Sequence, residues 1–409
     1  MKVGAIIAEY NPFHNGHKYQ IAKFKKESQL DYVLVIMSGN FTQRGEPAWM
    51  PKHLRAEMAL MGGADLVIEL PLYYATANAS LFAEGAIAHL NALGCVDELC
   101  FGCETDDSIE ALTSKLDQAS DILIKEPDEY KSLLLQYIKE GYSYPSAREH
   151  ALSSFFEDCV ELFSPNNILA MEYIISLKKT KSLIQPKPIV RKGLGYHDLN
   201  AEHSFASASA IRKQLSQEIP DDIQGLPLES LSIIQKNYHY SMPLSMNDFS
   251  NAFAISYMLN KDVLNTYLDI NDDLANLMMK HFDAYTDLEN FISSIKNKAY
   301  TYTRLSRCVN HILTQQKKDV FGMTTLNGYA HYARVLGFKK SSTDLLNQIK
   351  KSASIPLITK LSVYKDILDT VGQVMIQMDI ESSNLYRTVS QIKYKTPLKN
   401  EFTEKVVII

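Results

Sequence analysis

The sequence contains little cysteine and no long hydrophobic run. Its 409 residues include five cysteines and a single tryptophan. An odd number of cysteines in a chain of this length argues against a disulfide framework, so we expect free thiols. No stretch approaches the roughly 20 apolar residues of a membrane span. The apolar run over residues 3–8 ends at Glu9, which does not fit a secretion signal. We therefore expect a cytoplasmic protein without a membrane segment.

The chain also lacks an overall excess of positive charge. Its 42 Lys and Arg residues against 47 Asp and Glu residues give a net charge of −5. This balance excludes a protein that coats nucleic acid along its whole length. The charge is nevertheless uneven, because residues 291–360 carry 12 Lys and Arg but only two acidic residues. This basic segment has a net charge of +10 and the rest of the chain −15. The pattern predicts a basic domain attached to an acidic one.

Short apolar segments alternate with amphipathic segments in the first half of the chain. We expect strands over residues 3–8, 31–37, 65–70, 97–101 and 186–190, with helices between them. Such alternation is typical of a doubly wound parallel α/β sheet.

A linker with two prolines and a glycine, over residues 216–230, leads to segments with helical spacing only, such as 324–336. The sequence therefore predicts a Rossmann-like α/β domain over 1–215. It predicts an all-helical, basic domain over 216–409.

The clearest chemical signal follows the first expected strand, in the segment Asn11-Pro12-Phe13-His14-Asn15-Gly16-His17. Ligands of α/β sheets bind at the carboxyl ends of strands, and the start of a helix attracts phosphate. Gly16 permits a nucleotide to approach the backbone closely. His14 and His17 are three residues apart, so they share one face of a helical turn and can both donate hydrogen bonds to phosphate oxygens. Two structural or metal-binding histidines are the alternative.

A weaker signal lies far downstream, in Ser207-Ala208-Ser209-Ala210-Ile211-Arg212. Hydroxyl side chains before a helix can cap it and bind phosphate, and an arginine in the first turn can neutralise a polyphosphate. An ordinary serine cap is the alternative for this segment taken alone.

An HxGH motif after a strand, with a late Ser-x-Ser-x-Ile-Arg, is similar to the nucleotidyltransferase superfamily. Longer blocks resemble the bacterial tRNA(Met) cytidine acetate ligase family. Within residues 9–198 these blocks are EYNPFHNGH, SGNFTQRGEPA, GADLVIELP, FGCE, SPNNILAMEY and GYHD. RVLGF at 334–338 and PLITK at 356–360 extend the resemblance into the second half.

The resemblance implies a two-step reaction. Acetate is activated with ATP to acetyl-adenylate and pyrophosphate, and the acetyl group passes to the exocyclic amine of the wobble cytidine of elongator tRNA(Met). The resemblance implies that His14 and His17 are catalytic and lie in an ATP-binding loop formed by Ile7, Ala8, Glu9, Tyr10, Asn11, Pro12, Phe13, His14, Asn15, Gly16, His17, Lys18, Tyr19 and Gln20. It implies further ATP contacts at Gly102, Asn166 or Asn167, Arg191, Ser207, Ser209 and Arg212. Ala208 stands where the superfamily often has a serine.

The chemistry requires positioning and charge stabilisation more than a strong base, because acetate is ionised at neutral pH. We expect Mg²⁺ to accompany the phosphates without a dedicated set of protein ligands. Glu104 is a further candidate, for ribose or for a metal-held water, and an ordinary acid at a helix N-terminus is the alternative. Candidates for binding substrate or tRNA come from the loop after the second strand and from the basic segment: Asn40, Arg44, Lys52, Arg55, Arg304, Arg307, Lys339 and Lys340. A solvated surface is the alternative for these residues.

Two other functions compete with this interpretation. A small-molecule adenylyltransferase that acts on a phosphorylated metabolite would use the same pocket, but the basic half would then lack a purpose. An RNA-binding module with a degenerate nucleotide fold is less consistent with intact His14, Gly16, His17 and Arg212. No protein partner is implied.

Overall fold

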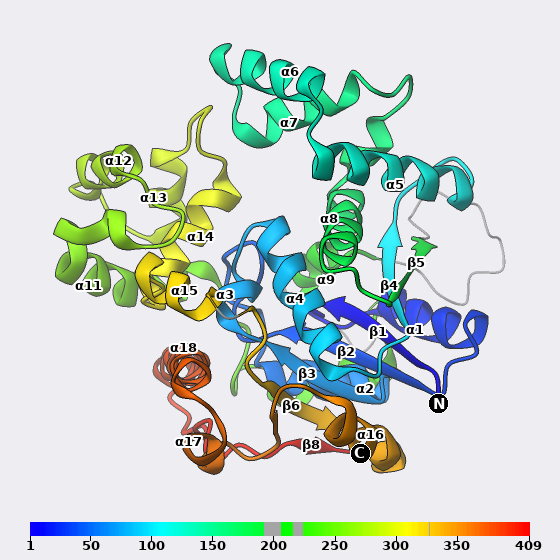
Figure 1. Ribbon diagram of the computed structural model, residues 1–409. Coiled ribbons are helices and arrows are strands. Elements are labelled where there is room, and N and C mark those ends of the chain that lie inside the picture. Colours follow the sequence, from blue (N-terminus) through cyan, green and yellow to red (C-terminus); the bar gives the residue numbers. More distant parts are fainter. Residues whose placement is uncertain (192–205, 216–222, 224, 327) are drawn as a thin grey trace.

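The computed structural model describes residues 1–191, 206–215, 223, 225–326 and 328–409 (Figure 1). Its sheet begins with five parallel strands from the first half of the chain: β1 (Val3–Ala8), β2 (Tyr32–Ser38), β3 (Leu66–Leu70), β4 (Glu98–Cys103) and β5 (Gln185–Val190). Their spatial order is β5-β4-β1-β2-β3. The chain first winds from β1 towards β3 and then returns to place β4 on the other side of β1. The order therefore reverses between β1 and β4, where open α/β sheets form a ligand crevice.

The parallel strands are apolar along their length because helices cover both faces of the sheet. One face packs against α4 (Ala79–Leu93), α5 (Ile109–Lys125) and α8 (Pro165–Lys179). The other face packs against α1 (Asn15–Glu27), α2 (Lys52–Met61) and α10 (Leu228–Asn237). Alternate residues of β2 enter opposite clusters, with Leu34 and Ile36 in one and Val33 and Val35 in the other. The expected doubly wound α/β architecture is confirmed.

A helical lobe with its own core lies to one side of the sheet (Figure 1). It consists of α11 (Ser250–Asn260), α12 (Asp272–Phe282), α13 (Leu288–Ile295) and α14 (Tyr302–Leu313). The next helix, α15 (Lys318–Thr325), packs Val320 and Phe321 against the sheet core instead. The long helix α18 (Thr370–Tyr394) joins this lobe to the sheet, because Tyr386 packs in the lobe core and Ile376 in the sheet core.

The remaining described elements connect these parts. Helices α6 and α7 pair with each other, and α9 carries the downstream serine-rich segment. The helices are α3 (Leu72–Ala75), α6 (Asp128–Lys139), α7 (Tyr144–Ser153), α9 (Ala208–Leu215), α16 (Thr343–Ser352) and α17 (Tyr364–Ile367). The 3₁₀ turns are η1 (Val160–Phe163), η2 (Met246–Phe249), η3 (Lys261–Thr266), η4 (Lys340–Ser342) and η5 (Leu361–Val363).

The second half is mostly helical, but it also returns to the sheet. Strand β6 (Ala333–Phe338) pairs antiparallel with β3, and β7 (Leu357–Ile358) and β8 (Val407–Ile408) pair with β6. The expectation of an all-helical second half is therefore wrong at these three strands. The helix expected over 324–336 is wrong as well, because α15 ends at Thr325 and β6 begins at Ala333. A short apolar run fits a buried strand as well as a helix, and only the open edge of β3 decides between them.

Some sequence predictions fall wholly or partly outside the described residues. The GYHD block lies there, as do residues 216–222 and 224 of the expected linker.

All five cysteines are free thiols, and Cys100, Cys103 and Cys308 are buried. Within the described ranges, no helix is both long enough and apolar enough to traverse a bilayer.

Candidate active site

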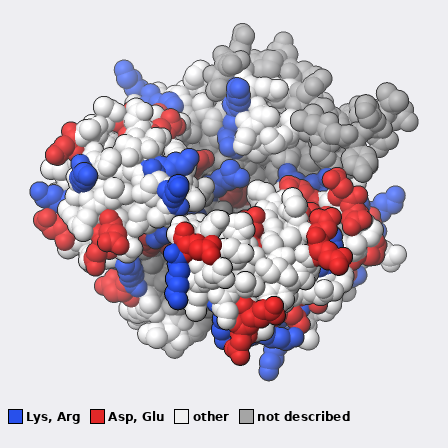
Figure 2. Space-filling model, turned by 90° about the horizontal axis from the view of Figure 1, so that it is seen from above, with Lys and Arg blue, Asp and Glu red and all other residues white. Residues whose placement is uncertain are grey.

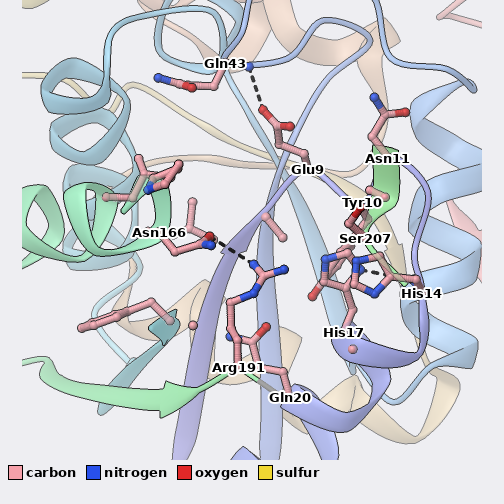
Figure 3. Close-up of a pocket in the computed structure, with 18 of the residues that line it drawn as sticks. Glu9, Tyr10, Asn11, His14, His17, Gln20, Gln43, Asn166, Arg191 and Ser207 are labelled. Carbon is pink, nitrogen blue, oxygen red and sulfur yellow. Dashed lines mark hydrogen bonds between the residues drawn. The ribbon is translucent and has the colours of Figure 1, made fainter. Parts of the chain in front are cut away.

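A pocket of about 740 Å³ opens at the carboxyl ends of β1 and β4, where the strand order reverses (Figure 3). The loop after β1 and the start of α1 form one wall. Residues at the end of β4, the start of α8 and the end of β5 form the opposite wall, and α9 closes one side. Segments more than 200 residues apart in the sequence thus meet in the crevice where open α/β sheets bind ligands.

His14 and His17 lie together at the start of α1. Their rings stack with centroids 3.6 Å apart, and the His14 backbone N–H donates to Nδ1 of His17 over 3.2 Å. Burial, with a smaller effect of Arg191, lowers the pKa of His14 to about 4, and burial also depresses the pKa of His17. Both rings are therefore neutral at pH 7. Because Nδ1 of His17 accepts a hydrogen bond, its proton resides on Nε2, which can donate to a ligand.

The loop between β1 and α1 is held from two sides. Tyr10 adopts a left-handed backbone conformation with φ of +48°, a conformation that costs energy and is common at functional sites. The Asn11 side-chain oxygen accepts a hydrogen bond from the Trp49 N–H over 2.8 Å. The Asn11 carbonyl accepts one from Nη1 of Arg212 over 2.7 Å. The downstream serine-rich segment is thereby fixed to the HxGH loop.

A chain of polar contacts forms the opposite wall. Nη1 of Arg191 donates to Oδ1 of Asn166 over 3.1 Å, and the Asn166 amide donates to the Glu104 carboxylate. Asn167 is fully buried and hydrogen-bonds both backbone groups of Glu104, at 3.0 and 2.7 Å. A Cβ at Gly102 would lie 2.9 Å from Cγ of Arg191. Gly102 therefore makes room for Arg191 at the rim of the pocket.

The structure brings most of the predicted ATP-binding residues into this one pocket. Those that line it are Ile7, Ala8, Glu9, Tyr10, Asn11, His14, Gly16, His17, Tyr19, Gln20, Gly102, Asn166, Arg191, Ser207 and Arg212. Those that do not are Pro12, Phe13, Asn15, Lys18, Asn167 and Ser209.

The residues outside the lining support the wall. The Asn15 N–H donates to the Gly225 carbonyl over 2.8 Å, so this helix N–H already has a partner. Lys18 pairs with Glu229. Ser207 both lines the pocket and accepts a hydrogen bond from the Ala210 N–H, so it also caps α9.

Three of the candidates for substrate or tRNA binding prove to be buried supports, which corrects that expectation. Lys52 is fully buried and pairs with Glu69 over 2.7 Å and with Glu401 over 3.1 Å. Asn40 accepts a hydrogen bond from the Lys52 N–H. Arg55 is also fully buried, and it donates to backbone carbonyls at the ends of both β1 and β2. These side chains hold the strand ends and loops in place and are closed to solvent.

Sequence reasoning missed the apolar side of the pocket and one amide side chain. The additional lining residues include Gln43, Phe82, Phe101, Ile168, Leu169 and Tyr173. No pattern in the sequence separates these residues from ordinary core residues, because a helix face that packs on the sheet and one that faces a ligand are equally apolar.

The basic segment does not form one surface. Arg304 and Arg307 lie on α14 in the helical lobe, whereas Lys339 and Lys340 lie beside α16, near the far edge of the sheet (Figure 1). Arg334 is buried and pairs with Glu69 and Glu401. In the view of Figure 2, Lys and Arg side chains gather near the middle of the face, while several groups of Asp and Glu lie nearer its edges.

The α14 part of the basic segment is linked to the pocket through one loop. The loop over residues 42–47 carries Arg44, which lines the pocket. Gly45 of the same loop has φ of +78° and packs on the backbone of Ser306 and Arg307, so a Cβ there would lie 2.4 Å from the Arg307 nitrogen. The loop therefore connects the pocket to α14.

A parallel α/β sheet with a paired-histidine pocket at its first crossover is the arrangement of a nucleotidyltransferase. A family model described as HIGH Nucleotidyl Transferase matches residues 1–401. The chain is 37% identical to the tRNA(Met) cytidine acetate ligase of Acetivibrio thermocellus, over 100% of both chains. It is 39% identical to that of Caldicellulosiruptor saccharolyticus, over 100% of this chain and 99% of the relative.

Solved structures agree. Thermotoga maritima TmcAL bound with alpha-thio ATP gives a TM-score of 0.89 at 29% identity, covering 100% of this chain and 99% of that one. The apo form gives 0.91 at 30% identity, covering 100% of both. The chain belongs to the HIGH nucleotidyl transferases and, among them, to the tRNA(Met) cytidine acetate ligase family, which confirms the resemblance read from its motifs.

Proposed function

We propose that this enzyme activates acetate with ATP, forms acetyl-adenylate and pyrophosphate, and acetylates the exocyclic amine of the wobble cytidine of elongator tRNA(Met). The observation that carries the proposal is the single pocket that unites the HxGH loop with Gly102, Asn166, Arg191 and Arg212. The names of its relatives and the ATP analogue of its structural neighbour support the same reading. A tRNA substrate makes the cytoplasm the proposed site of action.

The proposed nucleotide position follows from the chemistry of the two walls. Phosphates would lie at the start of α1, where the neutral imidazoles of His14 and His17 donate hydrogen bonds and Arg191 and Arg212 supply positive charge. Adenine would pack against the apolar wall that includes Phe101 and Tyr173. Acetate would then attack the α-phosphate, and its carboxylate needs no base.

Mg²⁺ is proposed as a companion of the phosphates. No group of three or more His, Cys, Asp and Glu side chains is positioned to hold a metal in the described part of the chain. The Glu104 carboxylate, which lines the pocket, is compatible with an ion that keeps several waters and binds chiefly to phosphate. Such an ion would neutralise charge on the triphosphate.

The anticodon loop is proposed to approach from the α14 side. Arg44 is exposed at the pocket, and Arg304 and Arg307 lie on the helix against which its loop packs. Arginine side chains neutralise phosphates. The wobble base is already unpaired in an anticodon loop, so bringing it into a pocket costs little. Lys339 and Lys340 lie away from this approach.

Labelling tests the proposal. Purified full-length protein is incubated with radioactive acetate, ATP, Mg²⁺ and bulk tRNA, and nucleosides are then separated. Acetylcytidine confined to elongator tRNA(Met), and dependent on ATP, is the expected result. Transfer of AMP to a phosphorylated metabolite, with no labelled nucleoside, would instead identify the small-molecule adenylyltransferase.

A further inference from the structure

Glu9 is a carboxylate at one end of a pocket whose histidines and arginines suit a polyanion. It follows β1 directly and lines the pocket, and Oε1 accepts a hydrogen bond from the Gln43 N–H over 2.7 Å (Figure 3). Among the ion pairs of the described residues, none involves its side chain. A carboxylate repels phosphate, so Glu9 has no role in the nucleotide binding proposed above.

The surroundings make Glu9 a stronger proton acceptor than an ordinary glutamate. Burial raises the pKa of its carboxyl, against the lowering effects of the Gln43 N–H and the Arg55 guanidinium. The other ionisable groups that act on it or feel its charge are Arg44, Glu46, Tyr173 and Arg212. A desolvated carboxylate with a raised pKa suits proton transfer near neutral pH.

The Glu9 end of the pocket is also the end that adjoins the helical lobe. Gln43, whose N–H holds Glu9, precedes Arg44 and Gly45 in the loop that packs on the α14 backbone. In Figure 3, Glu9 and Gln43 lie together at one end, and His14 and His17 lie beside the start of α1. A base that enters from α14 would meet Glu9 before it met the histidine pair.

We infer that Glu9 is the catalytic residue that receives the cytosine amine in the second step. One N4–H of cytosine donates to the carboxylate, the pairing that Glu and Asp make with cytosine in base recognition. N4 then attacks the acetyl carbonyl, the new N–C bond forms, the bond from that carbon to the AMP oxygen breaks, and the N4 proton passes to Glu9. AMP leaves with the electron pair. Uracil presents an oxygen acceptor at this position, so the same carboxylate would reject it.

This inference rests on the proposed function, and its test separates the two half-reactions. Acetate-dependent ATP–pyrophosphate exchange reports the first step. Single-turnover transfer from synthetic acetyl-adenylate to an elongator tRNA(Met) transcript reports the second. Glu9→Gln keeps the shape and the Gln43 contact but removes the base. We expect transfer to fall at least about 100-fold, and exchange to fall less than about tenfold.

The pH profile provides a readout that a merely structural role would not move. Wild-type transfer should rise as pH increases through the raised pKa of Glu9, because the carboxylate is the active form. Glu9→Asp should keep this rise at a reduced rate, and Glu9→Gln should lose it. An equal fall in both half-reactions, or an unchanged transfer rate in Glu9→Gln, would overturn the inference. Failure of the wild-type chain to make any acetylcytidine would instead remove the proposed function.

Discussion

The pocket and the basic segment differ in how their residues come together. Much of the pocket comes from one local segment, because residues 7–20 run from the end of β1 into α1 as a continuous turn. The basic segment is continuous in the sequence as well, yet folding divides it between α14 in the lobe, β6 in the sheet and the region of α16. A motif whose residues form one continuous turn stays together in the folded protein. Residues that only share an excess of positive charge over a 70-residue segment need not form one surface.

The largest expected effect concerns the histidine pair. His14→Ala or His17→Ala should lower acetate-dependent ATP–pyrophosphate exchange at least about 10³-fold, because each removes a donor aimed at developing phosphate charge. Affinity for tRNA, measured by filter binding, should change less than about twofold. His150→Ala is the control, since His150 is exposed on α7 and should leave both measurements unchanged. Loss of tRNA binding in the pair variants would contradict the division between pocket and lobe.

The Lys52→Met variant tests whether Lys52, which the sequence predicted to bind substrate or tRNA, is instead a structural residue. Lys52→Met leaves the buried Glu69 and Glu401 with Arg334 as their remaining cation. Removal of one partner of a buried ionic cluster should cost about 3–4 kcal/mol of the free energy of unfolding. Urea unfolding measures this loss. Unchanged stability with a raised KM for acetate or tRNA would restore the earlier assignment.

Gly45 tests the contact between the two regions. Gly45→Ala should lower the free energy of unfolding by about 2–3 kcal/mol, because alanine is strained at φ of +78° and its Cβ would clash with the Arg307 backbone. Gly141→Ala is a matched control with φ of +90° and no atom within 4 Å of the added Cβ. Gly141→Ala should lower the free energy of unfolding by about 1 kcal/mol, from the strain of the left-handed backbone conformation alone. Equal losses in urea unfolding would mean that the loop does not depend on α14.

The smallest expected effect compares the two parts of the basic segment. Arg304→Gln should weaken tRNA binding about fivefold and lower the slope of log affinity against log salt concentration by about 1, for one lost phosphate contact. Arg307 is left in place, because its side chain is largely buried and pairs with Asp269. Lys350→Gln removes the same charge from an exposed position on α16 and should leave both affinity and slope unchanged. The reverse ranking in binding titrations at several salt concentrations would place the tRNA on the other side of the molecule.

The first half of the fold was predictable because each strand carries its own apolar run, bounded by turn residues, and each helix its own amphipathic spacing. The site was predictable where a motif fixed both residue type and position, as with His14 and Gly16. Prediction failed at Lys52 and Arg55, because a polar side chain that binds a ligand and one that binds a buried carboxylate or carbonyl have the same sequence signature.

By itself, the amino-acid order determined the parallel sheet, the position of its ligand crevice and the pairing of two imidazoles with a glycine between them, because these features depend on neighbours a few residues apart. Folding in three dimensions decided which cations face solvent, that β6 completes the sheet, and that Glu9, Gln43 and α14 meet at one end of the pocket. These contacts join residues tens to hundreds of positions apart, and packing and burial of charge select them rather than any local pattern.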